Sequence, residues 1–353
     1  MGVVGLAGIA NYHIQGILES LDAELWSISD VNEVTLQMKA EQYQVPDSRC
    51  YTSYKEMLQH SGIDALSICT PNFNHFEIAL AAIENNIPFA VEKPVALNTH
   101  EAEILNRKVK ESNLPNMVCF SYRYKSAARY AKWLIAQGSL GRITHVYTQY
   151  LQSWAINEQI PLIWRFQKSL SGSGALGDLG SHMLDLTRFL VSDIEKIFSH
   201  AGTLIKERNV IDSPEIGHVD VDDFCHWIAQ LEGNISATAA ISRFAYGRGN
   251  YQRVEIYGTE GSLIYNLEED DSLDVCLPGE DGHTNGFQKA TIPDSFKADQ
   301  MQAFFDIVNG KGDGLSATMQ DGLINQKSLD AIIRSFTEGV WVSLNQEDEK
   351  NVN

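Results

Sequence analysis

Short apolar runs alternate with helical patterns over the first 120 residues of the chain. Five runs have the length and composition of buried strands, at 2–6, 24–30, 63–70, 87–93 and 116–120. Helical patterns lie between them, for example at 77–86 and 100–112. Alternating strand and helix signals predict βαβ units, and therefore a parallel, doubly wound sheet.

Longer strand patterns replace this alternation after about residue 120, at 142–154, 218–231, 234–244 and 252–259. Turn sequences separate some of them, which predicts a mostly antiparallel sheet. The acidic stretch 268–286 is expected to be an exposed loop or sheet edge, and a strong helical pattern covers 322–339. We therefore expect an α/β protein with a first domain at 1–120, a second, α+β domain at 121–342 and a tail at 343–353.

The composition is that of a large globular protein that needs no disulfides to hold its core. The chain has 353 residues and a formal net charge of -19, which disfavours nucleic acid and anionic membranes as partners. Its five cysteines form no C-x-x-C pair, which favours a reducing compartment. No stretch has the pattern of a signal peptide or the length of a membrane span. These features predict a cytoplasmic protein.

A glycine-containing turn follows the first predicted strand. The sequence GLAGIA, which supplies Gly5, Ala7, Gly8, Ile9 and Ala10, approximates the dinucleotide fingerprint G-x-G-x-x-G/A. Such a turn brings backbone N–H groups and a helix N-terminus to a pyrophosphate. The methyl group of Ala7, at the middle position, would crowd the place where the backbone comes closest to the pyrophosphate. Gly8, the next residue, could relieve this crowding. The alternative is a glycine-rich turn that binds nothing.

Asp30 ends the second predicted strand, at the spacing expected of a ribose-binding carboxylate. A carboxylate there accepts hydrogen bonds from a ribose 2′-OH and repels a 2′-phosphate. Val31 and Asn32 follow, with no lysine or arginine, so NAD is favoured over NADP. The alternative role for Asp30 is to cap the next helix.

Two further motifs follow predicted strands of the first domain. They are Thr70-Pro71-Asn72 and Glu92-Lys93-Pro94. The carboxyl ends of parallel strands line the ligand crevice in such sheets, which would bring Lys93 near a bound nicotinamide. The alternative is a solvated loop lysine.

The stretch LGDLGSHMLD, residues 176–185, places charged groups among core-like residues. Asp178 and His182 are four apart and so share one face of a helix. Gly172, Gly174 and Gly177 would let the backbone pass close to a cofactor. The alternative for His182 is a hydrogen-bonded core histidine, and for Asp185 we expect a structural role.

In order and spacing, these motifs resemble the Gfo/Idh/MocA oxidoreductases from about residue 2 to about residue 342. The matching segments are GLAGIA, Asp30, TPNFNH (70–75), EKP (92–94), SYRY (121–124), SGSGALGDLGSHMLDL (171–186) and DGL (321–323). The resemblance implies a Rossmann domain followed by an open, mostly antiparallel sheet that commonly forms a homodimer or homotetramer interface. Residues 150–178 look like members that oxidise a ring hydroxyl of sugars or cyclitols, including levoglucosan and inositol dehydrogenases.

The resemblance implies an NAD-dependent oxidoreductase that transfers a hydride between nicotinamide and a ring hydroxyl or ketone of a small sugar or cyclitol. The catalytic lysine of the family falls on Lys93, and its D-x-x-x-H pair falls on Asp178 and His182. An imidazole titrates near neutral pH and suits the removal of the hydroxyl proton. The carboxylate would orient the imidazole or bind a neighbouring hydroxyl, and the ammonium would stabilise charge on the reacting oxygen.

The same resemblance supplies the remaining site residues. Expected cofactor contacts beyond the glycine turn and Asp30 are Thr70, Pro71, Asn72, His75, Glu92 and Lys93. Expected substrate contacts are Tyr122, Arg123, Tyr150, Gln152, Trp154, Trp164 and Arg165. Aromatic faces stack on the C–H faces of sugars, while Arg and Gln bind hydroxyls. The alternative is that half of these substrate candidates pack in the core or sheet.

A metal site is not expected. The segment 218–227 holds His218, Asp220, Asp222, Asp223 and His226, but a strand would spread these ligands too far apart to share one ion. Two other functions stay open. One is a glycosidase that retains NAD with no net redox change, and the other is a non-catalytic nucleotide-binding protein. The set of Lys93, Asp178 and His182 argues against the second.

Overall fold

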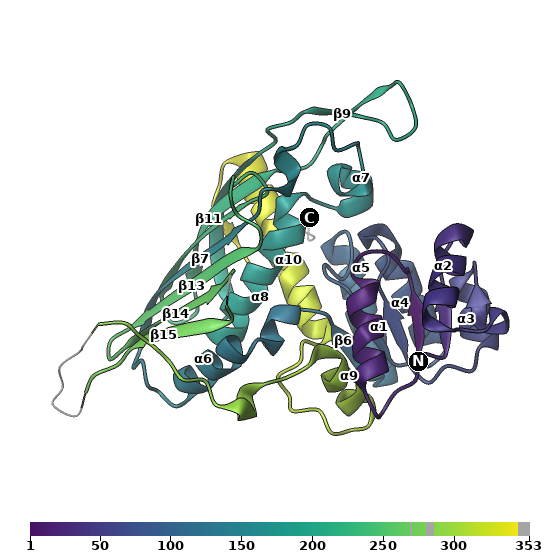
Figure 1. The fold of residues 1–353 in the computed structure, drawn as a ribbon. Coiled ribbons are helices and arrows are strands. Elements are labelled where there is room, and N and C mark those ends of the chain that lie inside the picture. The colour runs from purple at the N-terminus through teal and green to yellow at the C-terminus, as the bar shows by residue number, and fades with distance from the viewer. Residues whose placement is uncertain (269, 280–285, 345–353) are drawn as a thin grey trace, which may run out of the picture. The chain divides into compact units, whose positions relative to one another are not determined.

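The computed structural model describes residues 1–268, 270–279 and 286–344, and it divides the chain into two compact units (Figure 1). The N-terminal unit comprises Met1–Ser121 and Ala298–Gln326, and the C-terminal unit comprises Tyr122–Lys297 and the chain from Lys327 onward. The N-terminal unit therefore includes a late segment that the sequence pattern assigned to the second domain. The predicted tail lies outside the described residues, apart from residues 343 and 344.

The N-terminal unit contains a six-stranded sheet. Its order is β3 (Cys50–Tyr51), β2 (Ser27–Ser29), β1 (Gly2–Val4), β4 (Leu66–Ile68), β5 (Phe89–Val91) and β6 (Asn116–Val118). All of the pairings within it are parallel. This is the strand order of dinucleotide-binding sheets, whose ligand crevice lies at the reversal between β1 and β4. The five strands expected from sequence are all present, and the two-residue β3 was missed.

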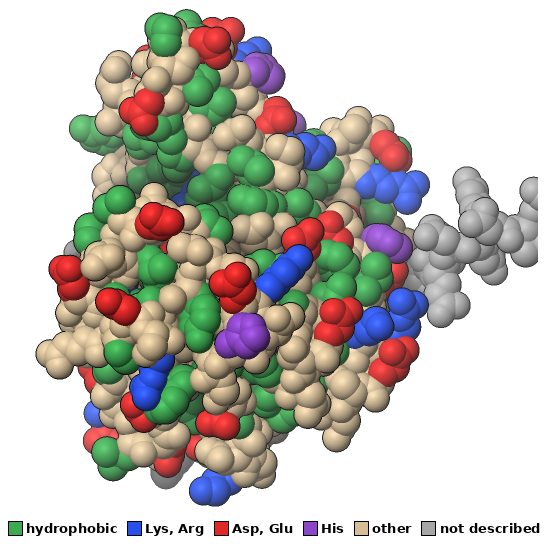
Figure 2. Space-filling view, turned by 90° about the vertical axis from the view of Figure 1, so that its right-hand side faces the viewer, with side chains coloured by type: hydrophobic (Ala, Val, Ile, Leu, Met, Phe, Trp, Pro, Cys, Tyr) green, Lys and Arg blue, Asp and Glu red, His purple; other side chains and the backbone are tan. Residues whose placement is uncertain are grey.

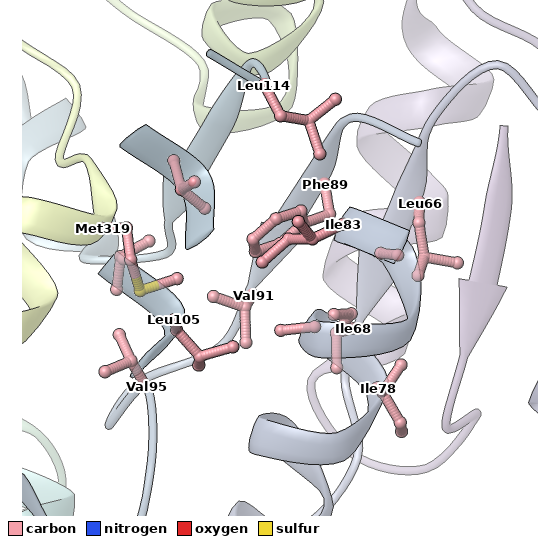
Figure 3. Close-up of a cluster of buried hydrophobic side chains, with 14 of the residues drawn as sticks. Leu66, Ile68, Ile78, Ile83, Phe89, Val91, Val95, Leu105, Leu114 and Met319 are labelled. Carbon is pink, nitrogen blue, oxygen red and sulfur yellow. The ribbon is translucent and has the colours of Figure 1, made fainter. Parts of the chain in front are cut away.

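Helices connect these strands, as the alternation predicted. They are α1 (Ala10–Glu19), α2 (Glu33–Tyr43), α3 (Tyr54–His60), α4 (His75–Glu84) and α5 (Thr99–Ser112). A buried apolar cluster joins β4 and β5 to α4 and α5, with Phe89, Val91 and Ile68 at its centre (Figure 3). Each such side chain contributes about 1.5–3 kcal/mol when it leaves water.

The late helix α9 (Gln300–Val308) belongs to the N-terminal unit because it packs on α1. Ser20 donates to the side-chain oxygen of Gln302 at 2.9 Å, and the backbone N–H of Val118 donates to Ala317 at 2.8 Å. The boundary between the two units falls within α10 (Met319–Glu338). Such returns of the chain leave no local pattern in the sequence.

The C-terminal unit contains a nine-stranded sheet. Its order is β16 (Gln288–Lys289), β15 (Ser272–Cys276), β14 (Ser262–Leu267), β13 (Tyr251–Gly258), β7 (Ile143–Leu151), β12 (Ile235–Ser242), β11 (Phe224–Leu231), β8 (Ile194–Gly202) and β17 (Val342–Ser343). The central pair β7–β12 is parallel and the other pairs are antiparallel. The prediction of a mostly antiparallel sheet is therefore confirmed. The part of the acidic stretch at 269 and 280–285 lies outside the described residues.

One face of this sheet carries the helices α6 (Ser126–Ala136) and α8 (Ser181–Leu190) and the π-helical turn η6 (Leu176–Gly180). Along β7, Val146, Thr148 and Tyr150 are buried, while Tyr147 and Gln149 alternate with them on the exposed face. The two-residue period of a strand thus separates a covered face from an open one.

The predicted strand at 218–231 is wrong in its first part. A separate hairpin of β9 (Glu207–Asn209) and β10 (Ile216–His218) ends at residue 218, and β11 begins only at Phe224. The chain between them leaves the ladder because Asp222 and Asp223 accept hydrogen bonds from the backbone of other loops.

The surface is charged without a single dominant patch in the view of Figure 2, where acidic side chains are spread over the visible face. Among the described residues, none of the helices combines the length and apolar character that crossing a membrane requires.

Candidate active site

The turn after β1 forms an open backbone cradle. Gly5 has a φ of +80°, and a Cβ there would lie 2.8 Å from the backbone of Thr70, so the position needs glycine. Gly8 has a φ of +55° and open space where its Cβ would stand. The left-handed conformation falls on this glycine and not on Ala7, so the alanine causes no backbone strain. The cradle leads directly into α1, as binding of a pyrophosphate at a helix N-terminus requires.

Asp30 lies at the end of β2 and its carboxylate holds the glycine turn. One oxygen accepts from the N–H of Leu6 at 2.8 Å, and the other accepts from the N–H of Asn32 at 2.9 Å. The helix α2 is capped by Asn32, whose side chain accepts from Thr35, so the capping role proposed as an alternative belongs to the asparagine. Each carboxylate oxygen has a second lone pair, which leaves Asp30 able to accept from a ribose hydroxyl.

The loops after β4 and β5 are tied together by His75. This histidine is fully buried, and its ring nitrogens lie 2.9 Å from the carbonyl oxygen of Thr70 and 2.7 Å from that of Pro94. Asn72 is also buried, in the short turn η2 (Asn72–Asn74) that precedes α4. His75 therefore packs between the loops in which Thr70, Pro71 and Lys93 lie, and its single N–H donates to one of the two carbonyls.

Glu92 and Lys93 follow β5 directly. The Glu92 side chain is buried, with one oxygen 2.9 Å from Nε2 of His13 and the other 3.3 Å from the backbone N–H of Lys93. Lys93 itself is half-buried. His13 was missed in the sequence because its partner lies 79 residues further along the chain.

In the C-terminal unit, Asp222 anchors the start of η6. Its two carboxylate oxygens accept from the backbone N–H groups of Gly174 and Leu176, both at 2.7 Å. Burial raises the pKa of Asp222, while nearby Arg243 and the two N–H donors act against that rise. A Cβ on Gly174 would lie 1.8 Å from the carbonyl oxygen of Asp222, so this position also needs glycine. Asp222 thus acts as a backbone anchor.

Asp178 lies within η6 and His182 lies in the first turn of α8. Single π-helical turns of this kind are frequent at functional sites. Asp178 accepts from Nη2 of Arg243 at 3.4 Å. The Arg243 side chain is fully buried and its guanidinium carbon lies 5.1 Å from the ring centre of Trp154. Sequence reasoning also missed this arginine.

A network of neutral polar groups lies beside His182. The Tyr122 ring meets the His182 ring edge-on, with 4.5 Å between ring centres, and the Tyr150 ring centre lies at 6.1 Å. The two tyrosine hydroxyls are 2.8 Å apart, and that of Tyr150 donates to the side chain of Asn250 at 2.6 Å. Burial raises the pKa of both tyrosines, so both hydroxyls stay protonated.

Gln152 and Trp154 extend the same network. The Gln152 amide donates to Asn250 at 3.0 Å and accepts from the Trp154 indole N–H at 2.9 Å. Four of the predicted substrate contacts, Tyr122, Tyr150, Gln152 and Trp154, therefore belong to one hydrogen-bonded network, and its two tyrosines lie beside His182. Asn250 also belongs to this network, although it was not among the predicted site residues. It lies in an exposed turn just before β13, and no motif in the sequence marks it.

The other three predicted substrate contacts are placed differently. Arg123 is buried and forms a two-pronged ion pair with Asp185, with nitrogen–oxygen distances of 2.6 and 2.9 Å. This pair fastens the turn η3 (Ser121–Tyr124) to α8, which agrees with the structural role expected of Asp185. Arg165 instead stacks on its neighbour Trp164, with 4.3 Å from the guanidinium carbon to the ring centre. Both side chains are half-buried.

One cluster within the described part of the chain has three potential metal-ligand atoms within 4.8 Å of one another. It consists of His13, Glu92 and Cys119 in the N-terminal unit. The acidic segment considered in the sequence forms no such cluster, because its carboxylates bind backbone. Asp220, for example, accepts from the N–H of Lys168 at 2.6 Å.

Known families account for both units. Residues 1–120 match the oxidoreductase family with an NAD-binding Rossmann fold, and residues 128–264 match the GFO/IDH/MocA C-terminal domain. The chain belongs to the Gfo/Idh/MocA family of oxidoreductases, and its N-terminal unit is an NAD-binding Rossmann domain. The open cradle at Gly5 and Gly8 and the carboxylate of Asp30 fit that cofactor.

Individual relatives are dehydrogenases that act on sugars and cyclitols. The chain is 32% identical to levoglucosan dehydrogenase from Pseudarthrobacter phenanthrenivorans over 84% of its own length and 83% of that protein. It is 27% identical to the NAD-dependent scyllo-inositol 2-dehydrogenase of Bacillus subtilis, over 74% of this chain and 72% of that one. The solved structure of levoglucosan dehydrogenase with NADH superimposes with a TM-score of 0.89 at 29% identity, covering 98% of both chains.

The anchoring role of Asp222 predicts a specific loss of stability. Replacing Asp222 by Asn leaves one side-chain acceptor for two backbone donors, so we expect a loss of about 1–3 kcal/mol in urea unfolding. Asp220→Asn is the matched control, because that exposed carboxylate accepts from a single backbone N–H, that of Lys168, and an asparagine oxygen can still meet it. Equal stability of the two variants would show that Asp222 does not hold the loop.

Proposed function

We propose that the protein is an NAD-dependent dehydrogenase that oxidises a ring hydroxyl of a sugar or cyclitol, or reduces the corresponding ketone. Lys93, Asp178 and His182 are its catalytic residues in this proposal. The observation that carries it is the setting of His182, which follows Asp178 by four residues and lies against the rings of Tyr122 and Tyr150, whose hydroxyls are paired. Bound NAD supplies the hydride acceptor, and the protein has to remove the hydroxyl proton.

Each of the three residues has a distinct task. His182 takes the hydroxyl proton, because an imidazole is a suitable base near neutral pH. Asp178, held by Arg243, accepts a hydrogen bond from a neighbouring hydroxyl or from the imidazole. The Lys93 ammonium stabilises the negative charge that develops on the reacting oxygen.

The substrate is an uncharged polyhydroxylated ring in this proposal. The network that reaches His182 through Tyr122 and Tyr150 consists of hydroxyls, amides and an indole, which are able to exchange hydrogen bonds with sugar hydroxyls. Two described arginines of this unit already face carboxylates, Arg243 at Asp178 and Arg123 at Asp185. The activities of the relatives, on levoglucosan and scyllo-inositol, support the same substrate class.

The test follows the absorbance of the reduced cofactor, NADH formed from NAD or NADPH formed from NADP, against a panel of substrates. The panel contains myo-inositol, scyllo-inositol, levoglucosan, glucose, xylose and glucose 6-phosphate. We expect a signal with NAD on an uncharged ring. A glycosidase that retains NAD would release sugar from simple glycosides without net NADH, and a non-catalytic protein would bind NADH without turnover.

His182→Ala removes the proposed proton acceptor, and Lys93→Met removes the ammonium that stabilises negative charge on the reacting oxygen. Each variant should therefore lower kcat by about 100-fold or more. Quenching of tryptophan fluorescence by NADH should be nearly unchanged. His60→Ala and Lys55→Met, both exposed on α3, are the matched controls. Wild-type turnover in either catalytic variant would rule out its assigned role.

We also propose that the chain assembles as a homodimer or homotetramer through the open face of the nine-stranded sheet. A groove of about 650 Å³ on this face is lined by residues of β7, β12 and β13, including Tyr147, Arg253 and Tyr257. Tyr147 and Ile228 on the same face are 45% exposed, which favours a covering partner.

The five cysteines are all free, which supports the expected reducing, cytoplasmic compartment.

The assembly is tested by light scattering after size exclusion. Ile228→Glu places a charge on the open face and should lower the molar mass relative to wild type. Leu18→Glu, on the N-terminal helix α1 and 50% exposed, is the control for an added surface charge. A monomeric wild type would refute the proposed assembly.

A further inference from the structure

A buried chain of polar side chains crosses the N-terminal unit beneath the loops after β4 and β5. His13 projects from α1 and is 0% exposed. Its Nε2 lies 2.9 Å from an oxygen of Glu92, and its Nδ1 lies 2.7 Å from the hydroxyl of Ser67. The serine oxygen lies 3.4 Å from the sulfur of Cys69. One nitrogen of the ring therefore meets a group on β4, and the other meets a group just after β5.

The chemistry of this chain favours a charged pair. A carboxylate away from water is costly unless a cation or several donors meet it, and His13 is the group that meets Glu92. The other titratable groups around the pair are Tyr12 on α1, Cys69 after β4, Lys93 after β5, Cys119 after β6 and His75 on α4. Burial lowers the pKa of His13, but Cys69 and Glu92 outweigh it and raise that pKa to about 10.

Glu92 passes this constraint to the next residue. Its second oxygen accepts from the backbone N–H of Lys93 at 3.3 Å. On the other side of that lysine, His75 holds the carbonyl of Pro94 at 2.7 Å. We propose that His13 is a positioning residue for Lys93, because its imidazole fixes the Glu92 carboxylate and Glu92 fixes the backbone from which the lysine projects. The inference rests on the catalytic role proposed for Lys93.

A metal ion is the competing explanation for this cluster, since Cys119 lies within 4.8 Å of the ligand atoms of His13 and Glu92. The hydrogen bonds disfavour it. Both ring nitrogens of His13 have partners at 2.7 and 2.9 Å, so the geometry is complete without a cation. Elemental analysis of the purified protein decides between the two. Stoichiometric zinc that is lost on replacement of His13 would overturn the positioning role.

The experiment compares kcat and NADH affinity of His13→Gln and His13→Leu with those of wild type. Glutamine can still donate to Glu92 through its amide, whereas leucine offers no donor. We expect kcat of His13→Gln to be within about threefold of wild type and kcat of His13→Leu to be lower by about tenfold or more, with NADH affinity nearly unchanged in both. Asn106→Leu, which removes a buried polar side chain on α5, should leave kcat unchanged.

A merely structural role would lower kcat of His13→Gln and His13→Leu by the same factor, which would contradict the proposal. A second measurement is the coupling with Glu92. His13→Leu combined with Glu92→Gln should lose little more activity than either change alone, because both act on one interaction. Fully additive losses would overturn the link between the two residues.

The proposed function and this inference can fail separately. The substrate panel with wild type decides the function. If wild type turns over none of those substrates, hydrogen exchange at the Lys93 amide still tests His13, because its N–H bonds to the carboxylate that His13 holds. Faster exchange at Lys93 in His13→Leu than in Asn106→Leu would support the positioning role, and equal exchange would refute it.

Discussion

Pairing of buried carboxylates is the constraint on which the arrangement of the candidate site depends. A carboxylate that leaves water loses its hydration and has to be met by a cation or by backbone N–H groups. Glu92 is met by His13, Asp185 by Arg123, and Asp222 by the N–H groups of Gly174 and Leu176. None of these carboxylates is needed to fill a core. Each instead fixes a piece of backbone that bears a residue of the proposed site.

The consequences follow from position in the chain. Lys93 is the residue after Glu92, so the direction of its side chain follows from the carboxylate that holds its own N–H. Asp222 fixes the start of η6, which carries Asp178 and leads into His182. Arg123 forms its ion pair with Asp185, which lies on α8 about one turn after His182. The pair holds α8 against η3, the turn that carries Tyr122. Because a buried pair adds little net stability, these pairs are better explained by geometry than by stability.

The sequence predicted what is local and missed what is long-range. Strand lengths, the glycine turn and the D-x-x-x-H spacing depend on neighbours in the chain, so the parallel sheet was recovered together with the helices expected at 77–86, 100–112 and 322–339. His13, Arg243 and Asn250 act on partners 65 to 128 residues away, and nothing near them in the sequence marks them. Asp222 was noticed, but the pattern DVDD was assigned to a strand because its backbone partners could not be foreseen. The residues of α9 fell within the range expected for the second domain, because the packing of α9 on α1 is likewise long-range.

The hydrogen bonds of the two tyrosines beside His182 favour a role in substrate binding over a role in packing. A phenol buried in a core usually has one partner, and its position is then set by packing. Tyr122 and Tyr150 instead share their hydroxyls with each other and with Asn250, which is exposed. The network therefore runs from the histidine ring to solvent through groups that both donate and accept. If the tyrosines served only packing, each hydroxyl would have a single hydrogen-bond partner in the interior. Recognition of a polyol instead needs groups that can both donate to and accept from the hydroxyls of the substrate.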